Sequence, residues 1–137
     1  MLTDKEAFVY ALKRLAKQNL PSPKLASILQ EREATEAMIS YAITECQKLG
    51  YLDDRDWVSR FITYQKRQLR GPHRIRQELA RRGFPKHDIP YSEEEEEKAI
   101  AQFLTKKPLE KTRAIGALQR RGFSLSSILK VLQFDNN

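Results

Sequence analysis

Apolar residues recur at steps of three and four along most of the chain, which is the spacing that one buried face of a helix requires. The first such stripe consists of Ala7, Phe8, Ala11, Leu12 and Leu15. Later stripes repeat this spacing, and prolines and glycines separate them. No segment shows the strict alternation of apolar and polar residues that is typical of a half-buried strand. The pattern therefore predicts an all-α protein.

Glycines predict where several helices end. Three of them follow a helical stripe and precede an aromatic residue, in the pairs Gly50-Tyr51, Gly83-Phe84 and Gly122-Phe123. Glycine enters the left-handed conformation at little cost, and in a Schellman ending the next residue packs back on the preceding turn. The residues four positions before these glycines are all apolar, namely Cys46, Leu79 and Leu118. Gly71 also follows a helical stripe, so Gly71-Pro72 is predicted to end the long helix that starts near Asp53 and Asp54.

A segment in the middle of the chain is repeated near its end. Residues 74–84 read Arg-Ile-Arg-Gln-Glu-Leu-Ala-Arg-Arg-Gly-Phe, and residues 113–123 read Arg-Ala-Ile-Gly-Ala-Leu-Gln-Arg-Arg-Gly-Phe, at an offset of 39. A weaker copy runs from Lys24 to Arg32, at an offset of 50 from the middle one. Periods of this length are typical of helical arrays in which each unit contacts only its neighbours.

The repeat predicts three tandem units of up to three helices each, over residues 1–52, 53–91 and 92–137. In the middle unit, Pro85 and Pro90 leave room for about one helical turn, because proline cannot continue a helix. The third helix of that unit is therefore predicted to be shortened.

Positive charge is concentrated in the middle of the chain. The 137 residues include 25 basic and 18 acidic side chains, and +5 of the net charge of +7 falls in residues 53–91. Within them, residues 66–86 hold eight basic side chains and a single acid, Glu78. A merely solvated helix face is expected to mix both signs, so the run favours a surface that binds an anionic partner. The candidate partner-binding residues are Lys66, Arg67, Arg70, Arg74, Arg76, Arg81, Arg82, Arg113, Arg120 and Arg121.

The arginines of residues 74–82 are predicted to share one side of a helix. At 100° per residue, Arg74 and Arg81 lie on one face with Glu78 between them, and Glu78 could pair with Arg74 or Arg82. The adjacent pair Arg81-Arg82 recurs in the last unit. Arginine binds both carboxylates and phosphates through two parallel hydrogen bonds, so the residues alone leave a protein and a nucleic-acid partner open. Repeated arginines could engage a partner of helical periodicity at several points at once.

Other features argue against several classes of protein. The chain has two histidines, one cysteine and no glycine-rich phosphate loop, so we expect neither an enzyme nor a metal or cofactor site. Cys46 lies on an apolar stripe and is predicted to be buried. The lack of a signal peptide, a membrane-spanning run and paired cysteines predicts a cytoplasmic protein. The run Glu93–Glu97 is predicted to be a solvated first helical turn, while Trp57 and Phe61 are either core residues or partner anchors.

The motifs of the middle unit resemble those of the RecX family. They are Leu49-Gly-Tyr-Leu-Asp-Asp54, Arg60-Phe61, Gly71-Pro-His-Arg-Ile-Arg-Gln-Glu-Leu79 and Arg82-Gly83. In addition, Leu118-Gln-Arg-Arg-Gly-Phe123 followed by Ile128 resembles the last repeat of that family. The resemblance covers about residues 5–134. The family often has a second glycine shortly before Gly-Pro, whereas this chain reads Leu69-Arg70-Gly71-Pro72.

The resemblance implies a fold and a function. The fold would be three tandem three-helix repeats in a curved, elongated array. The function would be that of a regulator that inhibits the RecA recombinase: it binds in the groove of the RecA–DNA filament and limits strand exchange, ATP hydrolysis and co-protease activity in homologous recombination, DNA repair and the SOS response. We expect a monomer whose partners are the RecA filament and the single- or double-stranded DNA within it. The alternative is a sequence-nonspecific DNA-binding protein that uses the same basic face.

Overall fold

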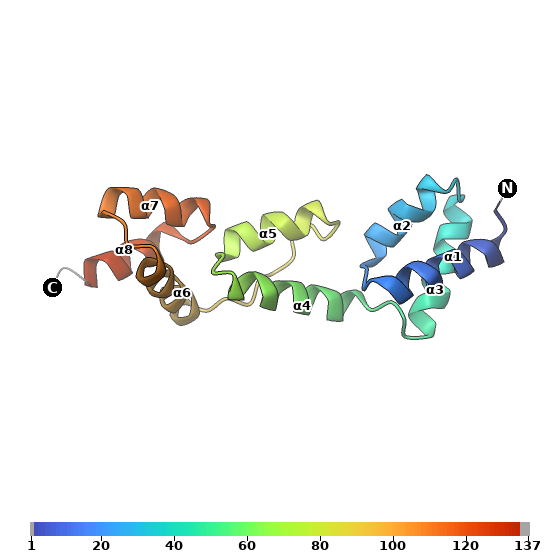
Figure 1. Cartoon of the computed structure of the whole chain (residues 1–137), viewed down its shortest axis with the longest axis horizontal. Coiled ribbons are helices and arrows are strands. Elements are labelled where there is room, and N and C mark those ends of the chain that lie inside the picture. The colour runs from blue at the N-terminus through green and yellow to red at the C-terminus, as the bar shows by residue number, and fades with distance from the viewer. Residues whose placement is uncertain (1, 135–137) are drawn as a thin grey trace. The chain divides into compact units, whose positions relative to one another are not determined.

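A computed structural model describes residues 2–134, which contain eight α-helices and no strand (Figure 1). In chain order the helices are α1 (Asp4–Lys17), α2 (Ser22–Glu31), α3 (Glu36–Lys48), α4 (Asp54–Arg67), α5 (Pro72–Arg81), α6 (Glu93–Lys106), α7 (Lys111–Arg120) and α8 (Leu125–Phe134). The predicted all-α class is confirmed.

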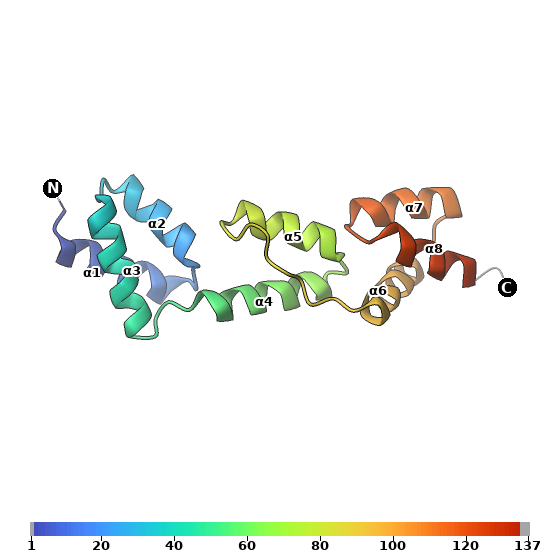
Figure 2. The same ribbon diagram turned by 180° about the vertical axis from the view of Figure 1, so that it is seen from behind.

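The chain divides into two compact units, residues 1–60 and residues 61–137, and the division falls inside α4. In the first unit α3 packs against both α1 and α2, as Figures 1 and 2 show from opposite sides. Its core includes Leu25, Leu29 and Cys46, which are completely buried. Burial also raises the pKa of the Cys46 thiol, so the predicted packing role of this cysteine is confirmed.

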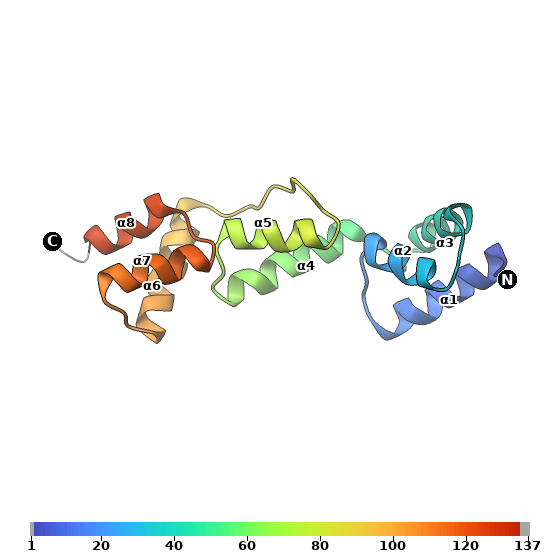
Figure 3. The same ribbon diagram turned by 90° about the horizontal axis from the view of Figure 1, so that it is seen from above.

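The second unit has its main core among α6, α7 and α8. Ile100, Leu118 and Ile128 lie at its centre and are completely buried. α5 runs back alongside the part of α4 that belongs to this unit (Figure 3), with Ile75 and Leu79 buried on its inner face. The apolar stripes read from the sequence are therefore the faces that form the cores.

The lengths of the helices repeat along the chain. The first helix of each repeat, which is α1, α4 or α6, has 14 residues. The second helix, which is α2, α5 or α7, has 10. Corresponding helices start 50 and then 39 residues apart, the same offsets that relate the sequence copies. The helices thus follow the internal repeat, while the unit boundaries after residues 52 and 91 remain a prediction.

The third helix of the middle repeat is missing among residues 82–92. These residues form turns and irregular backbone, with a turn at Pro85 and Lys86. The two prolines therefore reduce the element further than the predicted single helical turn, because each removes a backbone donor, and residues 87–92 have no regular secondary structure.

The backbone conformation of the predicted Schellman endings is confirmed at all three glycines. Gly50, Gly83 and Gly122 have φ values of +80°, +98° and +97°. The amide of the following aromatic residue donates to the carbonyl five residues back, from Tyr51 to Cys46 (3.0 Å), from Phe84 to Leu79 (2.9 Å) and from Phe123 to Leu118 (3.1 Å). Local chemistry and apolar pattern agree at these positions, which is why the sequence predicts them well.

The predicted break between two helices at Gly71-Pro72 is confirmed, but Gly71 itself does not have the left-handed conformation. The residue that turns left-handed after α4 is Leu69, with φ +58°, while Gly71 is extended and forms the N-cap of α5. Leu69 occupies the place near Gly-Pro where the resemblance leads one to expect another glycine. A leucine is strained there, but its side chain is only 8% exposed and packs into the second core, so burial offsets the strain.

The acidic first turn of α6 is only partly solvated. Ser92 and Glu95 form a reciprocal capping box, and Glu93, Glu94 and Glu95 are exposed as predicted. Glu96 is instead 6% exposed, and its Oε1 accepts a 2.6 Å hydrogen bond from the backbone amide of Ser124 at the start of α8. A helix N-terminus has free backbone amides, and those at the start of α8 stabilise the buried carboxylate of Glu96. Glu96 gains this role because α8 packs on α6.

Candidate partner interface

The basic surface lies in the second unit. Residues 1–60 contain nine basic and nine acidic side chains, whereas residues 61–137 contain sixteen basic and nine acidic ones. The whole net charge of +7 therefore belongs to the second unit, which also contains all ten candidate partner-binding residues. Their contacts within this unit separate them into two groups.

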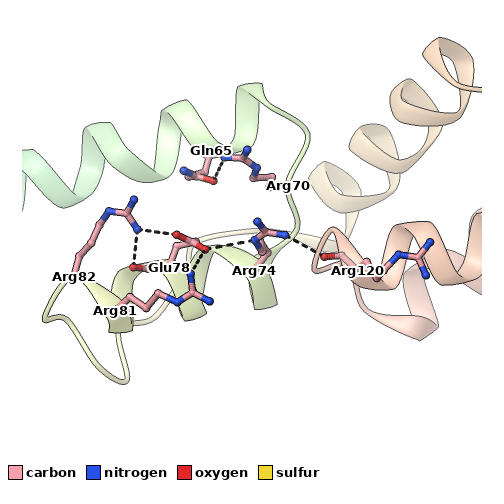
Figure 4. A network of polar contacts seen from close by, with 7 residues as sticks. All are labelled: Gln65, Arg70, Arg74, Glu78, Arg81, Arg82 and Arg120. Carbon is pink, nitrogen blue, oxygen red and sulfur yellow. Dashed lines mark hydrogen bonds and ion pairs between the residues drawn. The ribbon is translucent and has the colours of Figure 1, made fainter.

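Glu78 on α5 is the centre of one cluster of arginines (Figure 4). Its carboxylate lies 2.8 Å from Arg82 Nη1, 3.4 Å from Arg81 Nη1 and 3.6 Å from Arg74 Nε. The hydrogen bond from Arg82 is the largest cause of the lowered pKa of Glu78. Three guanidinium groups around one carboxylate leave a net charge of +2, so the cluster stays attractive to an anion.

Arg82 is held by its own helix and by an aromatic ring. Besides the carboxylate, its Nη1 donates to the backbone carbonyl of Glu78 at 3.1 Å. Its guanidinium lies 4.8 Å from the centre of the Phe61 ring. Arg82 therefore ties the end of α5 to α4, and its side chain is only partly available to a partner.

Arg121, the matching residue at the end of α7, has a structural role. Its Nε donates to the carbonyl of Leu69 at 2.9 Å, its Nη2 donates to the carbonyl of Gln68, and the guanidinium lies 4.9 Å from the Phe103 ring. Burial is the main cause of its lowered pKa, with nearby Arg70 and Arg74 adding to it. Arg121 satisfies carbonyls that α4 leaves without helical partners.

An arginine recurs directly after the second helix of each of the three repeats. Arg32, Arg82 and Arg121 follow α2, α5 and α7, at offsets of 50 and 39. Each guanidinium lies over an aromatic ring, 4.2 Å from Tyr10 for Arg32 and at similar distances for the other two. The sequence analysis did not predict these arginine–aromatic contacts, although the alignment of the three arginines in the repeats could have indicated them.

α7 and α5 meet end to end at two glycines. The amide of Gly71 donates to the carbonyl of Arg121 (2.8 Å), and the amide of His73 donates to that of Gly122 (3.0 Å). A Cβ on Gly71 would overlap the carbonyl group of Gly122, so glycine is required there by close approach. Carbonyls from the end of α7 thereby satisfy free amides at the start of α5, and the helix dipoles align.

Two further candidates are engaged within the unit. Lys66 lies 2.9 Å from Glu95, donates to the carbonyl of Pro90, and sits 4.8 Å from the Tyr91 ring. Arg70 donates to Gln65 at 2.8 Å. Burial and the neighbouring glutamates raise the pKa of Tyr91 to about 12, so this tyrosine stays protonated under the lysine.

The remaining candidates are exposed and project from the unit. Arg67, Arg76, Arg113 and Arg120 make no ion pair with an acid among the described residues, and the Arg81 side chain is 76% exposed despite its long contact with Glu78. In each Arg-Arg pair the first arginine is thus the more exposed one, and the second is held by contacts within the fold. Sequence alone did not distinguish them.

The described part of the chain offers no metal cluster of three or more His, Cys, Asp or Glu side chains. Among the same residues, no helix is long and apolar enough to cross a membrane.

Comparison with known proteins gives one consistent result, although no protein-family model matches the chain. A regulatory protein RecX of Thermus thermophilus is 32% identical over 129 residues, which cover 91% of this chain and 89% of that protein. RecX of Salmonella arizonae is 29% identical over 147 residues, covering 95% and 89%.

Solved structures show the same fold. The crystal structure of RecX from Lactobacillus salivarius matches with a TM-score of 0.80 at 17% identity, over 95% of this chain and 94% of that one. A second crystal structure of regulatory protein RecX matches with a TM-score of 0.81 at 19% identity, over 95% and 71%. With the sequence relationship to the Thermus protein, these findings show that the chain belongs to the RecX family.

Proposed function

We propose that this chain regulates the RecA recombinase by binding in the groove of the RecA–DNA filament, where it limits strand exchange, ATP hydrolysis and co-protease activity. Its family and the resemblance of its motifs support this role. The observation that bears most of the argument is the asymmetry of charge: all of the +7 lies in the second unit, and exposed arginines project from it. We expect it to act as a cytoplasmic monomer without catalytic activity, in homologous recombination, DNA repair and the SOS response.

The first arginine of each pair is proposed to contact the filament. Arg81 and Arg120 occupy the same position in successive repeats, and both are exposed. Contacts from successive repeats add through effective concentration when the partner is itself periodic, as a filament is. The three repeats over residues 1–52, 53–91 and 92–137 are proposed as the units of this docking.

Co-sedimentation with RecA filaments tests the proposal, with DNA alone as the control. The double variant Arg81→Glu, Arg120→Glu is expected to bind the filament at least about tenfold more weakly. Lys17→Glu, Lys24→Glu is the matched control, because it changes the net charge equally at exposed lysines of the first unit. Unchanged inhibition of the RecA ATPase by a folded double arginine variant would contradict the proposed role of these residues.

Sequence-nonspecific DNA binding is the second candidate function. It is favoured by the exposed arginines of α7, which have no acidic partner among the described residues. It predicts affinity for naked DNA that falls steeply with salt concentration. Binding that requires the filament, with negligible affinity for DNA alone, would exclude it as the main function.

A further inference from the structure

A groove of about 370 Å³ lies along α1 in the first unit and extends to the residue that follows α2. Three cations line it, Lys5 and Lys13 from α1 and Arg32 from the end of α2. Lys5 and Lys13 are eight residues apart, so their side chains start about 12 Å from each other on one side of the helix. Val9 lies midway between them and also lines the groove. The groove therefore presents an apolar position between two positive ones.

The cations of the groove have no acidic partners. Lys5, Lys13 and Arg32 make no ion pair with an acid among the residues that the structure describes. The lining includes one acid, Glu6, and its carboxylate already accepts a 3.2 Å hydrogen bond from the amide of Thr3 in the capping box of α1. The lining thus has a net charge of +2, although the first unit as a whole is neutral.

Arg32 differs from its counterpart in the next repeat. Arg82 is hydrogen-bonded to Glu78 four residues before it, whereas the residue four before Arg32 is Ile28. The guanidinium of Arg32 instead lies 4.2 Å from the centre of the Tyr10 ring, which also lines the groove. The ring holds the guanidinium in place and leaves most of its hydrogen-bond donors to an anionic ligand.

The apolar side chains of the groove distinguish between kinds of anion. Leu2 and Val9 line it, and Val9 is 39% exposed. A phosphodiester backbone has no apolar group to cover these side chains, and Arg32 covers a face of the Tyr10 ring on which a base could stack. A peptide can offer both carboxylates and an apolar side chain, and acidic motifs are recognised in this way by clusters of cations. The lining therefore fits an acidic peptide better than a nucleic acid.

We propose that the α1 groove binds an acidic peptide segment of a partner protein, in which an apolar side chain lies between two carboxylates. In an extended peptide the first, third and fifth side chains point the same way, and the first and fifth are about 13 Å apart. This distance matches the spacing of Lys5 and Lys13, so each lysine contacts one carboxylate and Val9 contacts the apolar side chain. Arg32 adds a second cation beside one of the carboxylates.

The inference goes beyond the proposed function. The groove lies in the first unit, and its lining contains none of the ten candidate partner-binding residues. It is tested by NMR titration of the isotope-labelled full chain with the synthetic peptide Gly-Glu-Ser-Leu-Ser-Glu-Gly with capped termini, because NMR detects weak binding and locates it. The amide signals of α1 and Arg32 are expected to shift. A peptide with serine in place of leucine should bind at least about threefold more weakly, and one with lysines in place of both glutamates should not bind.

Variants of the chain separate the groove from the general charge of the first unit. The groove variant carries Lys5→Gln, Lys13→Gln and Arg32→Gln, and is expected to bind the peptide at least about tenfold more weakly. The matched control removes the same two lysines and one arginine at exposed positions outside the lining, by Lys17→Gln, Lys24→Gln and Arg55→Gln. Val9→Ser keeps the charge and is expected to weaken binding about threefold. The spectrum of each variant also shows whether it is folded.

Each outcome decides the proposal. Shifts located in α1, lost in the groove variant, weakened by Val9→Ser and kept in the control variant, support it. Equal losses in the groove and control variants overturn it, since they show only general electrostatics. The absence of shifts at millimolar peptide, or shifts located in the second unit, also overturns it. An oligothymidine that shifts the signals of α1 at the same concentration as the peptide overturns it in favour of a nucleic acid.

Discussion

The ends of α5 and α7 have the same four residues, Arg-Arg-Gly-Phe, and their glycine and phenylalanine amides form the same backbone hydrogen bonds, yet their surroundings differ. At the end of α7, Gly122 is packed on the backbone of Arg74 and Phe123 is only 2% exposed. At the end of α5, Gly83 is exposed and Phe84 is half-buried. The copy at the end of α7 therefore forms a packed joint with the start of α5 inside the second unit, whereas the copy at the end of α5 remains at the surface of that unit.

The arginines before these glycines follow the same division. Arg121 hydrogen-bonds to carbonyls that follow α4, whereas Arg82 hydrogen-bonds to Glu78 of its own helix and contacts only the Phe61 ring of α4. The position equivalent to Glu78 is Ala117 in α7, so Arg120 has no local acid. A repeated motif therefore fixes local geometry, and the neighbours decide whether its side chains hold the fold or face a partner.

Gly122→Ala is expected to have the largest effect, because it adds both strain and a clash. A Cβ at this residue would overlap the backbone nitrogen of Arg74, and φ is +97°. We expect a loss of about 3–5 kcal/mol in the free energy of unfolding. Gly83→Ala, at the exposed copy, should lose only the left-handed strain of about 1 kcal/mol. Urea unfolding measures both.

Gly50→Ala gives the reference for strain alone, since φ is +80° and no atom lies within 4 Å of the added Cβ. If Gly122→Ala costs no more than Gly50→Ala and Gly83→Ala, the joint between α7 and α5 does not exist as described.

Arg121→Ala is expected to have the next largest effect on the free energy of unfolding. It leaves the carbonyls of Gln68 and Leu69 without their donors, at a cost of about 2–3 kcal/mol in unfolding free energy. Arg82→Ala removes a more exposed contact and should cost about 1 kcal/mol or less. The difference between the urea unfolding midpoints of the two variants measures how much more Arg121 contributes to stability than Arg82. Equal midpoints would contradict a structural role that Arg121 has and Arg82 lacks.

Glu78→Gln has a small expected effect on stability and a distinct dependence on pH. The arginines hold the pKa of Glu78 below its ordinary value of 4.5 in the folded chain. Ionised Glu78 therefore stabilises the fold above pH 4.5, and this contribution is lost as the pH falls through the lower folded-state pKa. At neutral pH the variant should be about 1 kcal/mol less stable, and the difference from wild type should vanish in acid.

The same variant makes α5 more like α7, because it releases Arg74 and Arg81 from their acid. Unfolding curves recorded from neutral pH down to pH 3 check the stability claim. A difference between variant and wild type that stays constant across that range would show that charge on Glu78 does not matter to the fold.

Much of the fold was predictable from residues close in sequence. The apolar stripes predict the helices, and the glycine-aromatic pairs predict three helix ends. The repeat offsets of 50 and 39 anticipate the matching helix lengths. These features depend on hydrogen bonds and contacts within a few residues, which a sequence pattern reports directly.

The failures have a common cause in contacts between distant segments. The local pattern places Gly71 at a helix end, but the approach of Gly122 is what requires a glycine there, and buried Leu69 takes the left-handed turn. The same kind of pattern places Glu96 in solvent, but α8 covers it. No local pattern reports a neighbour that lies about thirty or more residues away.

Residue order alone is enough to establish that the chain is helical, repeated, rich in positive charge over its second half, and similar in its motifs to one family. Which arginines are free follows only from the packing of the folded chain. Arg81 and Arg121 look alike in sequence, but one is exposed and the other is partly buried against carbonyls about fifty residues away. Helix formation can be read from the sequence because its hydrogen bonds lie within each segment. The availability of a charged side chain cannot, because it depends on which other segments pack around it.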